Sequence, residues 1–174
     1  MRLVYFSYFH SILSYGIIFW GNSVHSKYIF KIKKRTMRVI TDSGMRDFCR
    51  KLFKKQQILP PSSQYILSLL MFVVKNRVLF ESNSDIHHIG TRYNSDLHLP
   101  STQLNLFQKG VYYSGIKIYN HLPLSIKYVS HDIRRFKWAL KGFIQSNSFY
   151  SLEEYFNWNW WLLLCLVTLY WFFN

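Results

Sequence analysis

The fold is decided by residues 61–80, PSSQYILSLLMFVVKNRVLF. Among the ten residues Tyr65–Val74, only Tyr65 and Ser68 carry a polar group. A helix built from these residues is therefore apolar on every side rather than along one stripe. A helix of that kind belongs at the centre of a bundle. We expect Ser62 or Ser63 to cap it and the helix to run through Phe80.

Helical periodicity recurs on both sides of this central segment. It predicts a helix over residues 24–41 with Ser23 as its N-cap, a second helix over residues 47–55, a short apolar helix or packed turn at 111–120, and a helix capped by Asp132 that runs to about residue 145. No strand pattern persists. The fold class is therefore mainly α, a small helical bundle with a long central loop and an apolar C-terminal helix.

Residues 2–20, RLVYFSYFHSILSYGIIFW, are almost continuously apolar or aromatic. Signal peptides need a basic start, a compact aliphatic stretch and a small-residue cleavage site, whereas Tyr, Ser and His interrupt this run. A buried helix is the favoured interpretation, and a membrane or targeting segment is the alternative.

The long central loop covers residues 82–102, which are rich in turn-forming residues. His87, His88 and His98 lie in it near two aspartates, so a metal site deserves consideration. The loop offers no cysteine, and no two of these histidines have the four-residue spacing of a helical zinc site. We therefore predict no metal site.

Positive charge is spread unevenly along the chain. The 174 residues carry 22 Lys and Arg against 8 Asp and Glu, a net charge of +14. Residues 151–174 contain two acids and no base, so residues 1–150 carry 22 bases against 6 acids, or +16. Eleven of the bases fall within residues 27–55, opposed only by Asp42 and Asp47. This surplus predicts a polyanionic partner, either nucleic acid or an anionic membrane surface.

The bases of the two helices at 24–41 and 47–55 recur at steps of one, three and four residues, which places those of the first helix on one face. In the second helix we expect Phe48, Leu52 and Phe53 to point inward. Arg92 in the loop adjoins Tyr93 and is suited to pair with a phosphate while the ring stacks on a base. The predicted nucleic-acid-binding residues are Lys27, Lys31, Lys34, Arg35, Arg38, Arg46, Arg50, Lys54, Lys55 and Arg92.

No base-reading motif is visible, so the predicted binding is independent of sequence, with RNA or an RNA:DNA duplex as the partner. A solvated basic face without a ligand is the alternative. Neither a phosphate-binding glycine loop, a nucleophile elbow nor an HExxH zinc motif occurs, and Cys49 has no evident base beside it. We expect a non-catalytic protein without cofactors. Two cysteines cannot make a disulfide framework, which favours an intracellular location.

Residues 151–174 form a second predicted segment, in which two glutamates precede an aromatic and apolar tail. The stretch from Tyr155 to Phe173 is uncharged and 19 residues long, just enough for a helix that crosses a membrane. Its Trp and Tyr residues resemble the aromatic belts of membrane proteins, but two asparagines interrupt its start and no bases precede it. A tail anchor, packing on the bundle, and an unselected extension all remain open; an inserted tail implies a membrane location, and otherwise the nucleus or cytoplasm.

Several short motifs occur in an order typical of one known family. They are YFHSILSYGIIFWGNS at residues 8–23, KKRTMRVI at 33–40, CRKLF at 49–53, ILP at 58–60, TR at 91–92, GIKIYNHLP at 115–123, FKWALK at 136–141 and FYSLEE at 149–154. With them, residues 2–156 resemble the C-terminal portion of jockey-like non-LTR retrotransposon reverse transcriptases, which are RNA-directed DNA polymerases.

In that family this portion follows the polymerase palm and corresponds to the thumb and the region beyond it, whose helices hold the template–primer duplex. The resemblance therefore implies a duplex-binding helical domain over residues 1–150. Polymerisation in the family needs an Asp-Asp pair that holds two Mg²⁺ ions, and this chain has no Asp-Asp. The endonuclease and Cys/His knuckles of such elements are also absent. We expect a truncated element or a fragmentary gene model, inactive as a polymerase by itself.

Overall fold

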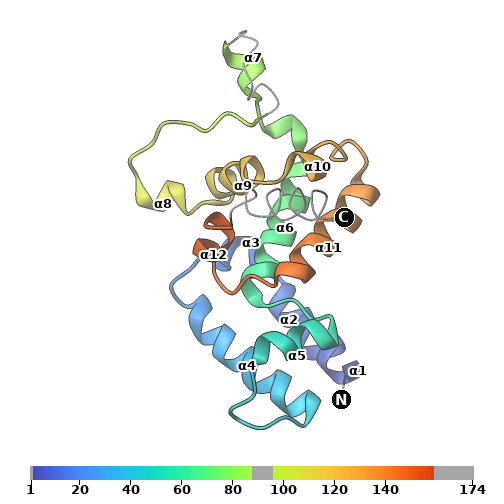
Figure 1. Ribbon diagram of the computed structural model, residues 1–174. Helices are drawn as coiled ribbons and strands as arrows, with labels where there is room; N and C mark the ends of the chain where they lie inside the picture. Colours follow the sequence, from blue (N-terminus) through green and yellow to red (C-terminus); the bar gives the residue numbers. More distant parts are fainter. Residues whose placement is uncertain (1, 88–95, 159–174) are drawn as a thin grey trace, which may run out of the picture.

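A computed structural model describes residues 2–87 and 96–158 of the chain, and it is mainly helical (Figure 1). The described residues form no strand, only one isolated antiparallel bridge between Ser82 and Leu97. This confirms the mainly α prediction. The helices are α1 (Arg2–Val4), the π-helix η1 (Tyr5–His10), α2 (Ser11–Ser14), α3 (Ile17–Trp20), α4 (Ser26–Thr41), α5 (Cys49–Gln56), α6 (Pro61–Lys75), the 3₁₀ helix η2 (Arg77–Leu79), α7 (Asn83–His87), α8 (Asn105–Gln108), α9 (Val111–Asn120), α10 (Leu124–Lys127), α11 (Ile133–Asn147) and α12 (Leu152–Phe156).

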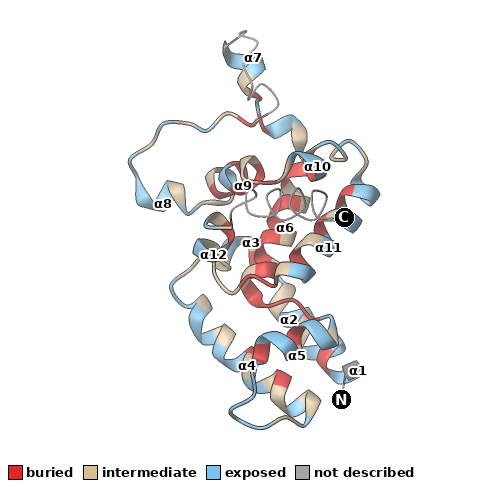
Figure 2. Ribbon diagram, in the orientation of Figure 1, coloured by how far each residue is buried: buried red, intermediate tan, exposed pale blue. Residues whose placement is uncertain are grey.

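The central position of α6 is confirmed, since it contacts α3, α4, α9 and α11 (Figure 1). Its side chains make up the middle of a large cluster of buried residues to which α9, α11 and α12 also contribute (Figure 2). The helices approach closely. A Cβ atom added to Gly115 of α9 would lie 2.8 Å from Cγ2 of Val73, so only glycine fits there.

The ends of α6 differ from the prediction. Pro61 occupies its first turn, where the missing N–H costs nothing, and neither Ser62 nor Ser63 caps the helix. Instead the Ser62 hydroxyl donates to the carbonyl of Tyr150 at 2.9 Å and the Ser63 hydroxyl to that of Phe149 at 3.0 Å. These serines tie the start of α6 to the α11–α12 connection. The helix ends at Lys75, and the turn η2 follows instead of further α-helix.

The prediction of a buried helix over residues 2–20 is wrong. Its first part winds as a π-helix, and Gly16, with φ +58°, breaks the rest. Tyr5 and Ile17 are buried, but Tyr8, Ile12, Tyr15 and Phe19 are largely exposed. The apolar run therefore covers only one side of the bundle, because a broken helix cannot bury side chains that point in every direction.

A small cluster of buried residues lies beside the large one, between the N-terminal segment, α4 and α5. It consists of Tyr5, Met37, Cys49, Phe53 and Ile58, with Phe9, Phe30, Ile40, Leu52 and Tyr150 packed against it. The small cluster holds α4 and α5 together at the end of the molecule where α1 and α2 lie (Figure 1).

Two other segments bear on the sequence predictions. Residues 83–87 of the predicted loop form the short helix α7. At its start, the Asp85 carboxylate accepts a hydrogen bond of 2.9 Å from the backbone N–H of Ser82. Tyr155, the first residue of the predicted membrane span, is 1% exposed in the large cluster and donates its hydroxyl to the carbonyl of Ile118 at 2.9 Å.

Residues 159–173 of the predicted span and apolar C-terminal helix lie outside the described residues, as does the start of the chain before Arg2. Within residues 2–87 and 96–158, no single helix has the length and apolar character to cross a membrane; α5 and α6 together meet that test as a pair bent by 46°.

Candidate nucleic-acid interface

Helix α4 carries the predicted basic face. It runs from Ser26 to Thr41, close to the expected range, but Ser23 does not cap it with its side chain; the backbone N–H of Ser26 donates to the carbonyl of Ser23 instead. Lys27, Lys31 and Arg35 are exposed. Lys34 and Arg38 are half-buried on the same face, so the helix brings all five predicted bases together.

The bases of α4 have no carboxylate partners in the part of the chain that the structure describes. Its ion pairs are Arg50–Glu154, Lys127–Asp96 and Arg135–Asp132, and none involves α4. The two acids between α4 and α5 do not neutralise the face either. Asp42 ends α4 in a left-handed conformation, and the Asp47 carboxylate accepts from the backbone N–H of Gly44 at 2.8 Å.

Helix α5 adds further bases beside α4. Lys54 and Lys55 are exposed on it, and Arg46 is exposed in the turn that precedes it. Phe53 is buried as predicted, but Phe48 is 80% exposed because it precedes the helix and does not share its inward face.

Arg50 uses its charged group for contacts within the protein. Its guanidinium lies 2.8 Å from a carboxylate oxygen of Glu154 and 4.4 Å from the ring centre of Tyr150. The ammonium of Lys34 lies 5.3 Å from the same ring and 4.2 Å from that of Phe30. Burial raises the pKa of Tyr150 to about 12, so its hydroxyl stays protonated and the ring neutral near both cations. Arg50 is therefore less available to a ligand than the bases of α4.

Lys33 is a base of α4 whose burial the count of charges does not show. It is 1% exposed, and no hydrogen bond or ion pair to it occurs among the described residues. Burial lowers its pKa to about 8. The same burial effect, with a smaller contribution from the Lys33 charge, lowers the pKa of His10. The spacing could have revealed Lys33, since it lies three residues after Phe30 and four before Met37 on the inward stripe of α4.

A groove of about 430 Å³ opens at the start of α4, and we name it the α4 groove. Lys27 and Phe30 line it from α4, Lys109 from the connection between α8 and α9, and Tyr150 and Glu153 from the start of α12. Lys109 is exposed and was not predicted as a site residue. No local pattern marks it, because only the tertiary fold brings it beside Lys27.

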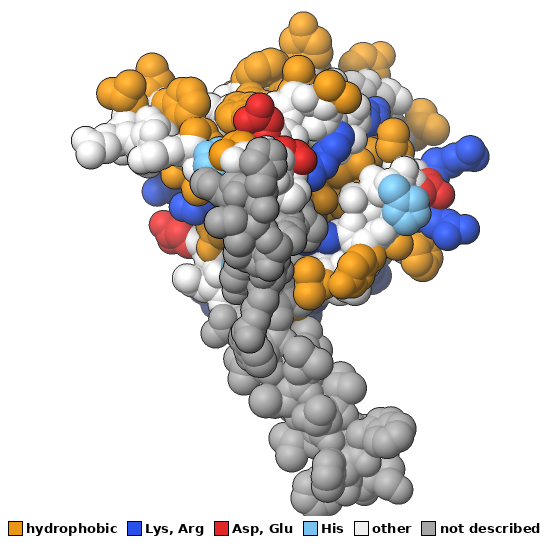
Figure 3. All heavy atoms as spheres, turned by 90° about the horizontal axis from the view of Figure 1, so that it is seen from above, with side chains coloured by type: hydrophobic (Ala, Val, Ile, Leu, Met, Phe, Trp, Pro, Cys, Tyr) orange, Lys and Arg blue, Asp and Glu red, His pale blue; other side chains and the backbone are white. Residues whose placement is uncertain are grey.

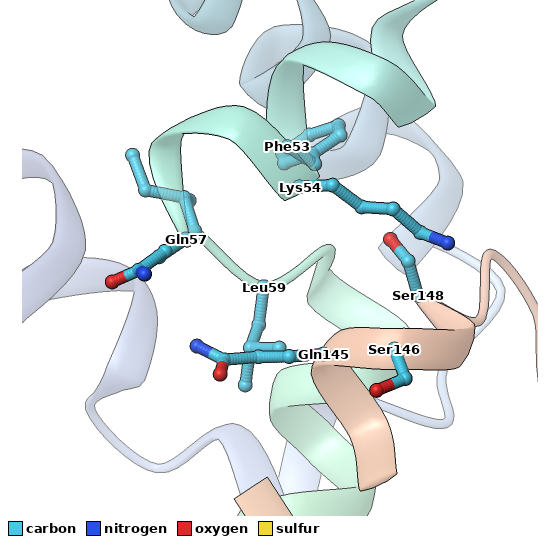
Figure 4. A pocket seen from close by; sticks show the side chains of 8 residues that line it. Phe53, Lys54, Gln57, Leu59, Gln145, Ser146 and Ser148 are labelled. Atoms are coloured by element: carbon cyan, nitrogen blue, oxygen red, sulfur yellow. The ribbon is translucent and has the colours of Figure 1, made fainter. Parts of the chain in front are cut away.

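A second hollow, the Lys54 pocket, has a volume of about 290 Å³ and lies between the ends of α5 and α11 (Figure 4). Lys54 and Ser148 extend toward one side of it, while the Gln145 and Gln57 amides lie toward the other (Figure 4). Ser148 is 2% exposed, and its hydroxyl has no hydrogen-bond partner in the described part of the chain. The pocket is lined by residues from the C-terminal ends of both helices, where the negative end of the helix dipole disfavours anions.

Bases are arranged differently at the α7 end of the molecule. Viewed from there, the described surface shows isolated blue side chains scattered among hydrophobic and acidic ones (Figure 3). On α11, Arg134, Arg135, Lys137 and Lys141 are exposed, but Arg135 pairs with Asp132, whose carboxylate also caps the helix as predicted.

Arg92 lies outside the described residues, so the structure does not connect it to the other predicted bases. His88 lies outside them as well, and the described residues contain no group of three or more His, Cys, Asp or Glu side chains that could hold a metal ion. Comparison of the chain with models of protein families, with curated proteins and with solved structures finds no match. The resemblance to reverse transcriptases thus stays a prediction from the sequence.

Proposed function

We propose that the protein binds nucleic acid without sequence preference through α4 and α5, as a non-catalytic module derived from a reverse-transcriptase thumb. One observation carries the proposal: five bases gather on one face of α4, and none has a carboxylate partner among the described residues. A basic face left unneutralised by its own fold attracts a polyanion, and regularly spaced bases suit the regularly spaced phosphates of a duplex.

The number of bases sets the expected salt dependence. If each of the five bases of α4 contacts one phosphate of a duplex, the logarithm of the binding constant falls with that of the salt concentration with a slope of about −4.5. Raising salt from about 50 to 200 mM then weakens binding roughly 500-fold. Contacts from Arg46, Lys54 and Lys55 would steepen the slope.

The test is fluorescence anisotropy with a labelled RNA:DNA hybrid at several salt concentrations. Lys31 and Arg35 are the residues to reverse, because both are exposed and four residues apart on the face. We expect the K31E/R35E variant to bind far more weakly and to lose about two from the magnitude of the slope. The matched control reverses Lys137 and Lys141, which are equally spaced and exposed on α11.

Two results would refute the proposal. One is that K31E/R35E binds the hybrid as tightly as the wild type. The other is that the α11 control weakens binding just as much, which would mean that net charge and not the α4 face drives association. Anionic vesicles are tested separately: if the wild type binds them, K31E/R35E does not, and the hybrid is not bound, the membrane alternative replaces this proposal.

A further inference from the structure

The α4 groove extends the basic face of α4 past the N-terminal end of the helix. Lys27 is the first base of that face and also lines the groove, and Lys109 approaches from a segment 82 residues further along the chain. Glu153 is the one acid that lines the groove, and it is exposed. Two ammonium groups against one carboxylate leave the groove net positive.

The remaining lining suits a sugar–phosphate unit. Ser23 and Ser26 also line the groove, and each can offer a hydroxyl to a phosphate or a sugar. Phe30 and Tyr150 add apolar surface to the lining, and their rings meet edge to face with the ring centres 4.7 Å apart. Helix α4, which begins here, has no acid in its first turn, so its positive end also favours an anion.

The size of the groove decides which form of nucleic acid enters it. About 430 Å³ lies at the small end of the range for pockets that hold one small molecule. One nucleotide of a single strand fits that range, whereas a duplex must stay on the exposed face of α4. We propose that the α4 groove holds the sugar–phosphate backbone of a single strand that extends from a duplex bound on α4, with a phosphate between Lys27 and Lys109.

This inference rests on the proposed function and adds a preference to it. The protein should bind a duplex with a short single-stranded extension more tightly than the same duplex with blunt ends. One additional single-strand phosphate contact increases the magnitude of the salt slope by about 0.7, which amounts to roughly fivefold in affinity at about 0.1 M salt.

The experiment compares a blunt RNA:DNA hybrid with the same hybrid carrying a three-nucleotide extension, for the full chain and two variants. Lys109→Gln removes one charge from the groove, and Lys137→Gln removes one from α11 as the matched control. Both lysines are exposed, so circular dichroism should show an unchanged fold. We expect Lys109→Gln to abolish the roughly fivefold preference and leave the blunt hybrid unaffected, and the control to retain it.

The inference is overturned if the wild type binds both hybrids equally or if Lys109→Gln weakens both to the same extent. Those outcomes leave the proposed function standing, because the blunt hybrid still binds with a steep salt dependence. If the blunt hybrid itself fails to bind, the proposed function fails, and the groove loses its role with it.

Discussion

Replacing the buried Lys33 with methionine should stabilise the protein. The change keeps an unbranched side chain, shorter by one atom, and removes a charge that no partner among the described residues neutralises. The pKa of Lys33 is lowered from 10.5 to about 8, and at about 1.4 kcal/mol per pKa unit the folded state gives up roughly 3 kcal/mol at pH 7 to keep the group protonated. Lys33→Met should recover much of that in the free energy of unfolding.

The buried Lys33 also makes the stability of the protein depend on pH, and this dependence identifies the residue. Between the lowered pKa of Lys33 in the folded chain and its ordinary value, the unfolded chain binds more protons, so stability rises with pH. From pH 7 to 9.5 the wild type should gain about 2 kcal/mol. Measurements above pH 9.5 are avoided because burial also raises the pKa of Tyr5 and Tyr155. At such pH these tyrosines ionise in the unfolded chain but not in the folded one, which lowers the stability of the fold.

Urea denaturation at pH 7 and 9.5 measures both effects. Lys31→Met serves as the control, since Lys31 is exposed two residues away on the same helix; it should change stability by less than about 0.5 kcal/mol and keep the pH gain. In Lys33→Met the pKa of His10 should also rise, which NMR titration detects, because the Lys33 charge helps to lower it. The reasoning is refuted if Lys33→Met is less stable than the wild type at pH 7 or still gains stability up to pH 9.5.

Three further substitutions test the packing around α6. Tyr155→Phe removes the hydroxyl that donates to the carbonyl of Ile118 and should cost about 1–2 kcal/mol in the free energy of unfolding, whereas an unchanged value would mean that this bond adds nothing. Gly21→Ala places a Cβ against the ring of Tyr65 and should cost about 1–3 kcal/mol, measured by thermal unfolding; an equally stable variant would contradict the close approach. Ser63→Ala deletes the buried hydroxyl that holds the α11–α12 connection and should cost about 1 kcal/mol in urea, with Ser63→Thr as the variant expected to retain the bond.

The sequence predicted the helices whose ends depend on local chemistry. Asp132 caps α11 because its side chain reaches the N–H groups of the next turn, and this short-range geometry can be read from the sequence. The α4 range was close to the observed one because its apolar and basic residues recur with helical spacing, although the predicted Ser23 cap was wrong. The serines at the start of α6 were wrongly assigned as caps, because their partners lie more than 80 residues away in sequence and no local pattern shows them.

Exposure was predicted less well than helicity. The apolar run at residues 2–20 was expected inside the bundle, yet the break at Gly16 and the small number of surrounding helices leave half of it exposed. Conversely, Lys33 was counted among the eleven bases of residues 27–55 without being recognised as buried, although its spacing places it on the inward stripe of α4. Composition alone cannot decide such cases, because burial depends on which neighbours the fold supplies. The same limit applies to Lys109, which lies at the α4 groove only because of the tertiary fold.

The two buried clusters have a consequence for the order in which the molecule opens. Helices α4 and α5 rest on the small cluster, which has five buried apolar residues and an enclosed charge beside them, whereas α6 runs through the large one. We expect amide protons of α4 and α5 to exchange with solvent through local opening, at lower free energy than those of α6. A polyanion that binds only the closed arrangement would then slow exchange selectively in that region, so that recognition and the last stage of folding become a single equilibrium.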